Sequence, residues 1–529
     1  MRARLVRGLG LLALCCASTA WAVEMEVPSG GGVVAAPPAL PIQGVWEVTP
    51  KRLLQQVIAR NADALYANLQ ARVAGQLLAA ESALGEPVSY ASLRHEDRFR
   101  QRTAQEKTSS IFSTQNELDE LVDTLELGVR SRLATGGEVS LSYRYTDRRN
   151  NIIRSGTGNP DAEYDGALTL TLKHPLLRGF GATAVDADRQ VAELEQAISR
   201  QQYKQQVLKV SSDALTAYWQ LYKAHELKRM REESRDNARR ALDDAREQVA
   251  AGRASRAVAS EAQALAGLRN VEVLRAEQGV SEAEARVKNL LGLPGHTYAA
   301  LHLKPVLDMA LVDASEAAAD VRPLTDARLN AVLDAWPPWQ VAQLRRRQGL
   351  VRLDYARNQV KPGLDVVASC SSSRLAYSSG EVTDNTFSTR YPDCYLGLNF
   401  ELPLQGNRRA TAQHGAQQLR IAQSDLELEA VRGAMANDLL SRAALLTSAI
   451  AEIEEIRRDV ALRGQLLDAE RVQMGMGLSR LAQVIERENA LNEARARLLE
   501  SLTRQELART ALRLADGSLL QRHAIELGE

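Results

Sequence analysis

Four stretches of the chain alternate between apolar and polar residues, and the sequence predicts a β-strand in each. They cover residues 125–133, 139–145, 168–173 and 396–402, and the sequence TGG at residues 135–137 predicts a turn between the first two. Successive side chains of a strand point to opposite faces, so each strand has one apolar and one polar face. An apolar face packs either into the core of a soluble sandwich or against lipid in a membrane barrel. The strands are too few to close a sandwich within one chain, which favours a barrel shared between subunits.

Long proline-free segments with apolar residues at heptad spacing follow these strands. One register holds Val191, Leu194, Ile198, Leu208, Leu215 and Trp219, and a second holds Leu446, Ile453, Ile456, Val460, Leu467 and Met474. About 70 helical residues at about 1.5 Å each form a rod of ~100 Å, which predicts coiled-coil helices. Each rod turns back near a glycine, at Gly252 and Gly477. Many seam positions are Ala, Ser or Gln, which suits helices that pack on neighbours at both sides, as in a closed wall.

The order of helix, strands and helical hairpin occurs twice, which indicates an internal duplication. Residues 60–87 can be laid over residues 335–362 without gaps, and LKHPL at 172–176 corresponds to FELPL at 400–404. Each unit holds several elements, so the repeat is not that of a solenoid.

The domain organisation follows from these patterns. We expect a signal peptide at 1–22 and a linker at 23–47. The first repeat follows at 48–295, with a β segment at 88–174 and a helical hairpin at 182–291, and an inter-repeat segment covers 296–325. The second repeat covers 326–516, with a β segment at 364–402 and a helical hairpin at 406–516, and a C-terminal tail covers 517–529.

The β segments of the two repeats differ in length. Pro87 to Pro175 spans 88 positions and Pro362 to Pro403 spans 41, so the first repeat carries 88 − 41 = 47 more. The second repeat has room for two membrane-length strands of ~10 residues each. The extra residues form either another strand pair or a long folded loop, so the first repeat contributes two or four strands.

The N-terminus has the pattern of an export signal. Three arginines in the first seven residues, an apolar run at 9–18 and the sequence AWA at 20–22 predict a cleaved signal peptide. Cys15 and Cys16 lie within the apolar run, but the small residue that a lipobox places before its cysteine is missing. Whether the N-terminus is lipidated stays open.

The composition argues against several functional classes. The chain has 66 basic and 66 acidic residues, whereas nucleic-acid binding proteins carry a basic surplus. Only 4% of residues are aromatic, which is low for a large globular core. The histidines show no metal-binding spacing, and no phosphate-binding loop is present. We therefore expect no enzyme activity, no metal and no cofactor.

Several motifs resemble those of the TolC family of outer-membrane efflux factors. The resemblance covers about residues 48–516, and the order of the motifs carries it rather than any one of them. The motifs are KHPLLRGFG at 173–181, LPLQG at 402–406, AYWQL at 217–221, LLGLP at 290–294 and the glycine turns at 252 and 477. The family implies a homotrimer in which each subunit gives strands to one shared barrel and four helical strands to a periplasmic tunnel.

The expected fold is an α+β membrane protein. Its trimeric transmembrane β-barrel is continued by a long antiparallel α-helical coiled-coil barrel, built from two internal repeats per chain. Strand edges cannot stay unpaired in lipid, so closure through oligomerisation is required. Three copies of four strands make twelve, and three copies of six make eighteen.

The resemblance implies a passive duct in the cell outer membrane, with a periplasmic helical domain. It would serve a tripartite efflux or type I secretion system, together with a periplasmic adaptor protein and an inner-membrane pump. The cargo stays open among drugs, metals, polysaccharides and proteins. The alternative is a periplasmic adaptor or scaffold without a pore, but an adaptor carries one hairpin flanked by small β domains, and here the hairpin is repeated.

The hairpin turns are the expected functional site, because in the family they pinch the duct at its periplasmic tip. Gln483 and Glu486 stand where the family places acidic residues, Val258 where it often has an aspartate and Ser479 where an arginine partner can occur. The expected tip residues are Gln483, Glu486, Ser479, Met474, Gly477, Gly252, Ser255 and Val258. A matching strand-end motif consists of Pro175, Gly179, Pro403 and Gly406. An exposed helix-face carboxylate is the alternative interpretation of Glu486.

A disulfide between Cys370 and Cys394 is also expected. After signal removal they are the only cysteines, and an oxidising compartment favours their pairing. Both lie at apolar positions of their strands. If Pro362 and Pro403 lie opposite each other in the sheet, strict pairing places Cys370 opposite Tyr395. A bulge must then shift one strand by one residue to bring Cys370 opposite Cys394.

Overall fold

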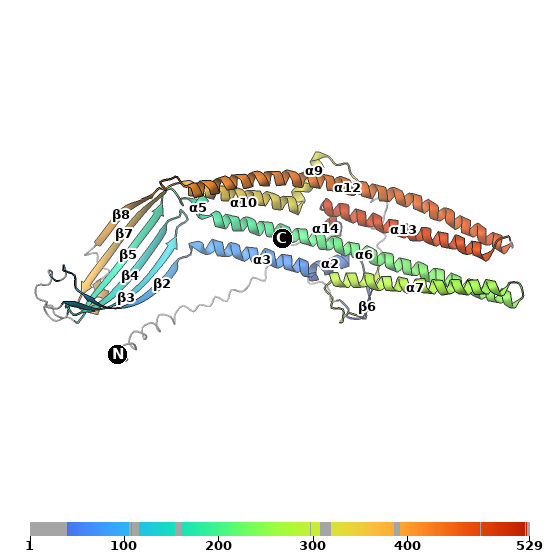
Figure 1. Cartoon of the computed structure of the whole chain (residues 1–529), viewed down its shortest axis with the longest axis horizontal. Helices are drawn as coiled ribbons and strands as arrows, with labels where there is room; N and C mark the ends of the chain where they lie inside the picture. The colour runs from blue at the N-terminus through green and yellow to red at the C-terminus, as the bar shows by residue number, and fades with distance from the viewer. Residues whose placement is uncertain are drawn as a thin grey trace.

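The structure is a computed structural model that describes residues 40–104, 107, 116–153, 161–296, 298–306, 319–385, 392–476, 478–523 and 525. Figure 1 shows an elongated molecule with a β-sheet at one end and two long helical hairpins that reach the other end. None of the described helices combines the length and the apolar character needed to cross a membrane.

The sheet has six strands in an antiparallel arrangement. In their order across the sheet they are β2 (Val88–Gln101), β3 (Glu117–Arg132), β4 (Glu138–Asn150), β5 (Glu163–Pro175), β7 (Gly363–Ala376) and β8 (Pro392–Glu401). The first half of the chain therefore contributes four strands and the second half two. The extra residues of the first half form a strand pair and not a long loop.

Alternation gives this sheet one apolar and one polar face, as the sequence pattern predicts. Val129, Leu141, Leu170 and Cys370 lie opposite one another in neighbouring strands, so their side chains share one face. The other face carries charged residues in ion pairs. Arg144 and Glu126 are 3.6 Å apart, and Arg148 and Glu120 are 3.5 Å apart.

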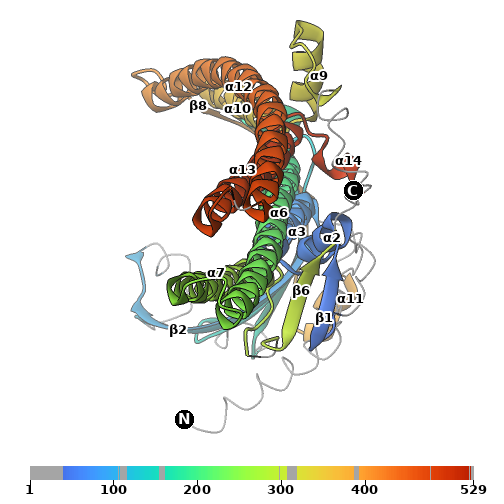
Figure 2. The same ribbon diagram turned by 90° about the vertical axis from the view of Figure 1, so that its right-hand side faces the viewer.

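The two hairpins are built from four long helices. They are α6 (Ala187–Ala250) with α7 (Arg256–Leu290), and α12 (Arg408–Gly475) with α13 (Leu481–Ala515). Near the sheet, α3 (Ala62–Ser82) packs on α6, and α10 (Pro337–Val360) packs on α12 and α6. Figure 2, viewed along the molecule, shows α12, α13, α6 and α7 as one curved layer with a concave side. The long helices thus form a wall rather than a compact bundle.

Smaller elements surround this wall at mid-length (Figure 1). They are β1 (Gly44–Val48), α2 (Pro50–Arg60), β6 (Leu301–Pro305), α9 (Asp326–Ala335) and α14 (Leu519–Arg522). β1 and β6 pair in parallel, so residues 44–47 of the expected linker belong to a strand of a small sheet. The expected tail includes α14, whose Leu519 is buried in the largest hydrophobic cluster.

Local sequence signals set the ends of several helices. The Asn61 side chain accepts hydrogen bonds from the N–H groups of Asp63 and Ala64, which caps α3. The same side chain donates to the carbonyl of Leu290 at 3.0 Å, near the end of α7. One asparagine thus joins the junction of α2 and α3 to the end of the first long hairpin.

Candidate functional site

The first hairpin turns at Gly252, whose φ of +71° lies in the left-handed region that favours glycine. Ser255 is the N-cap residue of α7, and its carbonyl accepts the N–H of Val258 at 3.1 Å. Val258 packs against buried Leu242 and Ala262. This position therefore holds the two helices together by apolar contact, where an aspartate would offer a polar tie.

The second hairpin turn is closed by polar side chains. The Ser479 hydroxyl donates a hydrogen bond to Glu470 and lies 2.8 Å from Oε1 of Gln483. Gln483 Oε1 also accepts the backbone N–H of Arg480 at 3.3 Å, in a capping box that starts α13. Arg487 and Glu470 form an ion pair at 3.6 Å. Gln483 and Ser479 thus hold the turn together.

Other expected tip residues are exposed. Glu486 forms no hydrogen bond or ion pair with any residue that the structure describes, and its side chain faces solvent in the single chain. Met474 is 38% exposed, and its neighbours Met476 and Leu478 are 67% and 76% exposed. Gly477 lies outside the described residues. The second tip therefore presents both a free carboxylate and an apolar surface.

The strand-end motif joins the sheet to the long helices. The Gly179 N–H donates to Oδ1 of buried Asn358 at 2.7 Å. After β8, the Gly406 N–H donates to the carbonyl of Pro403 at 3.0 Å. Arg178 forms an ion pair with Glu401 at 2.8 Å. These contacts lie where β5 and β8 end and the chain turns toward the long helices, and Pro175 still pairs with β7.

Cys370 and Cys394 lie directly opposite each other in β7 and β8 and form a disulfide, with an S–S distance of 2.17 Å and a Cα–Cα distance of 4.1 Å. The expected slip toward Tyr395 is wrong. Gly363 pairs with Glu401, so Pro362 and Pro403 do not mark the same level and no bulge is needed.

The family profile described as "Outer membrane efflux protein" matches residues 138–293 and 329–518. The chain belongs to the outer membrane efflux protein family. Its members are efflux channels of the outer membrane and not enzymes, so this chain is an outer-membrane efflux channel component with its helices in the periplasm. Among curated proteins no sequence matches the chain.

Solved structures share the fold at low sequence identity. A CusC structure, whose description refers to transmembrane channel formation, has a TM-score of 0.61 and 13% identity, covering 88% of this chain and 91% of that one. The Campylobacter jejuni CmeC outer membrane channel has a TM-score of 0.60 and 12% identity, covering 89% and 86%. The open Neisseria gonorrhoeae MtrE outer membrane channel has a TM-score of 0.59 and 14% identity, covering 89% of each chain. The adaptor alternative is not favoured.

Polar contacts between the two hairpins of this efflux protein were not foreseen from the sequence. Arg269 of α7 is only 7% exposed, and it donates to Asn489 of α13 and, at 2.8 Å, to Glu272. Glu272 also accepts from Arg231 of α6 at 3.2 Å. Arg269 therefore joins α7 to α13 across the boundary between the hairpins, and its partner Glu272 extends the contact to α6.

Two further contacts cross the same boundary. Asn237 of α6 donates to Glu488 of α13 at 3.1 Å, and Asn492 of α13 donates to Ser234 of α6 at 3.3 Å. They lie on the turns of α13 that follow Glu486. Arginine and asparagine are common on coiled-coil surfaces, so no sequence signal distinguishes these residues from solvated ones.

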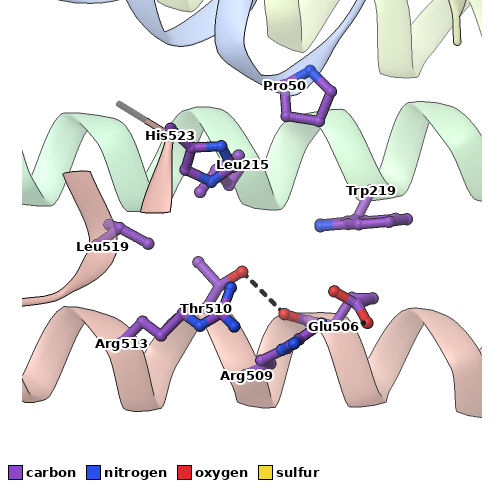
Figure 3. Close-up of a pocket in the computed structure, with 9 residues that line it drawn as sticks. All are labelled: Pro50, Leu215, Trp219, Glu506, Arg509, Thr510, Arg513, Leu519 and His523. Atoms are coloured by element: carbon purple, nitrogen blue, oxygen red, sulfur yellow. Dashed lines mark hydrogen bonds and ion pairs between the residues drawn. The ribbon is translucent and has the colours of Figure 1, made fainter. Parts of the chain in front are cut away.

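A buried charged cluster lies where α13 meets α6 and the C-terminal residues. Figure 3 shows a pocket lined by Glu506, Arg509 and Arg513 on one side and Trp219 and His523 on the other. Arg509 is 1% exposed. Asp320, which lies between β6 and α9, accepts from Arg509 at 2.8 Å and from Arg513 at 2.7 Å. The cluster ties α13 of the second hairpin to the chain that precedes α9.

Burial shifts two pKa values in this cluster. Burial raises the pKa of Glu506 to about 7, although nearby Arg509 and Arg513 act in the opposite direction. Burial lowers the pKa of His523 to about 4, and the positive charges of Arg513 and Arg522 lower it further. At neutral pH His523 is therefore uncharged, whereas Glu506 is only partly ionised.

Proposed function

We propose that three copies of this chain form a passive export duct. Their sheets close into one β-barrel in the outer membrane, and their helices form a tunnel through the periplasm. A periplasmic adaptor protein joins the tunnel to an inner-membrane pump, which drives transport. The duct serves efflux or type I secretion.

The open edges and the apolar face of the six-stranded sheet carry this proposal. In the described part of the chain, β2 and β8 each have a strand on one side only. On β8, Leu396 is 76% exposed, Leu398 68% and Phe400 64%. Such a surface suits lipid, where every strand edge must be paired. Neighbouring copies supply that pairing.

The curved helical wall supports the tunnel. The longest described helices have 64 and 68 residues and follow β5 and β8 after short connections. Three copies of such a layer surround a space along the barrel axis. Small side chains at the helix contacts, such as Ala238, Ala245 and Ala262, permit the close packing that a closed wall needs.

The tip of the second hairpin supports the roles of gate and adaptor contact. Three copies of Glu486 would form a ring of negative charge that attracts cations. Exposed Met476 and Leu478 offer an apolar surface to a helical adaptor.

Light scattering and fractionation test this proposal. The full mature chain, extracted from outer membranes in mild detergent, should have the mass of a trimer and should form ion-conducting channels in planar bilayers. Release from membranes without detergent, or a monodisperse monomer that forms no channels, would contradict it.

A further inference from the structure

The β2–β3 hairpin leaves the helical wall and returns to it at one point. β2 begins at Val88, directly after α3 and a short turn, and Val88 lies opposite Arg130 of β3. The Ser131 hydroxyl donates to the carbonyl of Gly85 at 3.2 Å. The two ends of this 45-residue unit (residues 88–132) therefore meet beside the end of α3.

The sequence also indicates that residues 88–132 have no counterpart in the second repeat. The β segment of the first repeat is 88 − 41 = 47 positions longer than that of the second, close to the length of the hairpin. In the second half, the family match starts at residue 329, ahead of both strands, whereas in the first half it starts at Glu138, the first residue of β4. The β4–β5 pair thus corresponds to the β7–β8 pair, and β2–β3 comes in addition.

The additional hairpin is part of the membrane-facing sheet. β3 pairs with β4 from Glu120 to Arg132, and its Leu127 lies opposite Tyr143 on the apolar face. β2 and β3 have 14 and 16 residues, longer than the ~9–11 that a spanning strand needs. On the other face, Arg98 of β2 lies 3.8 Å from Glu120 of β3. Both faces of the sheet therefore continue into the hairpin.

The apolar band crosses the strands obliquely. On β8 it centres on Leu398, which faces Val366 near the helical end of β7. On β3 it centres on Leu127, which aligns through β4 and β5 with Ser372, closer to the outer loops. Strands of a closed barrel tilt against its axis, so a band parallel to the membrane must cross them in this way.

We propose that the β2–β3 hairpin is an insertion that widens the shared barrel from twelve to eighteen strands, with the free edge of β2 paired with the free edge of β8 in the next copy. The inference rests on the proposed homotrimer. β2 runs away from the helices and β8 runs toward them, so the new pair is antiparallel like the others. A barrel of eighteen strands leaves a water-filled channel.

Cysteine crosslinking in the full chain tests which strand meets β8. In a Cys370→Ser, Cys394→Ser background, Tyr90→Cys or Ser92→Cys in β2 is combined with Tyr395→Cys or Gly397→Cys in β8, all on the polar face. We expect disulfide-linked dimers and trimers from at least one pair. The matched control places the first cysteine in β4, as Ser140→Cys or Ser142→Cys, where we expect none.

The outcomes separate the two proposals. Crosslinks from β4 to β8, or a trimer without any crosslink from β2, would overturn the eighteen-stranded barrel and leave the trimer standing. Loss of the trimer altogether would overturn the proposed function itself.

A deletion of residues 88–132 provides a second measurement. Because Gly85 and Ser131 are in contact, Pro87 can be joined to Leu133 with little movement of α3. We expect the deleted protein to form a trimer in which β4 now crosslinks to β8. In electron microscopy the intact barrel should be about 1.5-fold wider than the deleted one, in proportion to the strand number. Equal widths would contradict the inference.

Discussion

Arg269 of the first hairpin is hydrogen-bonded to Asn489 of the second, and the arginine is only 7% exposed. In a duct whose hairpins must separate for the tip to open, such a contact resists opening. Asn489 lies three residues beyond Glu486, so the contact and the proposed gate share one turn of α13. We therefore expect this arginine to link the stability of the wall to the opening of the tip.

Replacing Arg269 by alanine should loosen the tip. The change leaves Asn489 and Glu272 without their buried partner, at a cost of about 1–3 kcal/mol. We expect a lower thermal midpoint of the detergent-solubilised trimer and a higher single-channel conductance. Arg275→Ala, at an exposed position of the same helix, is the matched control and should change neither.

A double-mutant cycle with Asn489→Ala isolates the pair. If the two side chains act together, the double variant should lose less stability than the sum of the single variants. Additive losses, or a conductance that stays at the wild-type value in Arg269→Ala, would count against a lock between the hairpins.

Replacing Glu486 by glutamine should weaken cation selectivity. Three carboxylates around a narrow opening favour cations and hold divalent ones, and the neutral amide removes that charge with little change in size. Reversal potentials in a salt gradient measure the effect, together with block by divalent cations. Glu493→Gln, exposed further along α13, serves as the control. Unchanged selectivity in Glu486→Gln would assign the residue to a solvated helix face.

The cysteines of the mature chain should be bonded to each other. Cys370 and Cys394 close a loop with a sequence separation of 24, which contributes about 3 kcal/mol in the chain-entropy model. We expect no labelling of the denatured, unreduced protein by a thiol reagent and two labelled thiols per chain after reduction. Two reactive thiols before reduction would show that the cysteines are free. Cys370→Ser should lower the thermal midpoint of the trimer.

The periodic parts of the fold were predictable from sequence, because helices and half-buried strands leave a local pattern. The hairpins around Gly252 and the strands around Leu127 and Leu170 follow from it. β2 was missed because its sequence, VSYASLRHEDRFRQ, has few apolar residues on either face, so only its pairing with β3 identifies it.

Details of the site depend on packing and were less predictable. The expected register of β7 and β8, with Pro362 opposite Pro403, was wrong by one residue. Strand register is set by neighbouring strands as well as by the loop that joins the two strands. The cap formed by Gln483 and the contact of Arg269 with Asn489 depend on how distant helices meet. Residue types alone do not contain that information.

The buried cluster of Figure 3 should give the protein two opposing pH dependences. Between pH 4.5 and about 7, the unfolded chain releases the proton that folded Glu506 keeps, so the free energy of unfolding falls as pH rises. Between about pH 4 and 6.5, the unfolded chain binds a proton that folded His523 lacks, so the free energy of unfolding rises with pH. Each effect amounts to up to about 3 kcal/mol, and in the wild type they largely cancel.

Single variants should reveal each half of this balance. In Glu506→Gln only the histidine remains, so the thermal midpoint should rise with pH between 4 and 6.5. In His523→Gln only the carboxyl remains, so the midpoint should fall between pH 4.5 and 7. The double variant should remove both contributions and serves as the control. Thermal melting of the trimer at half-unit steps of pH measures all four proteins, and parallel curves would contradict both assignments.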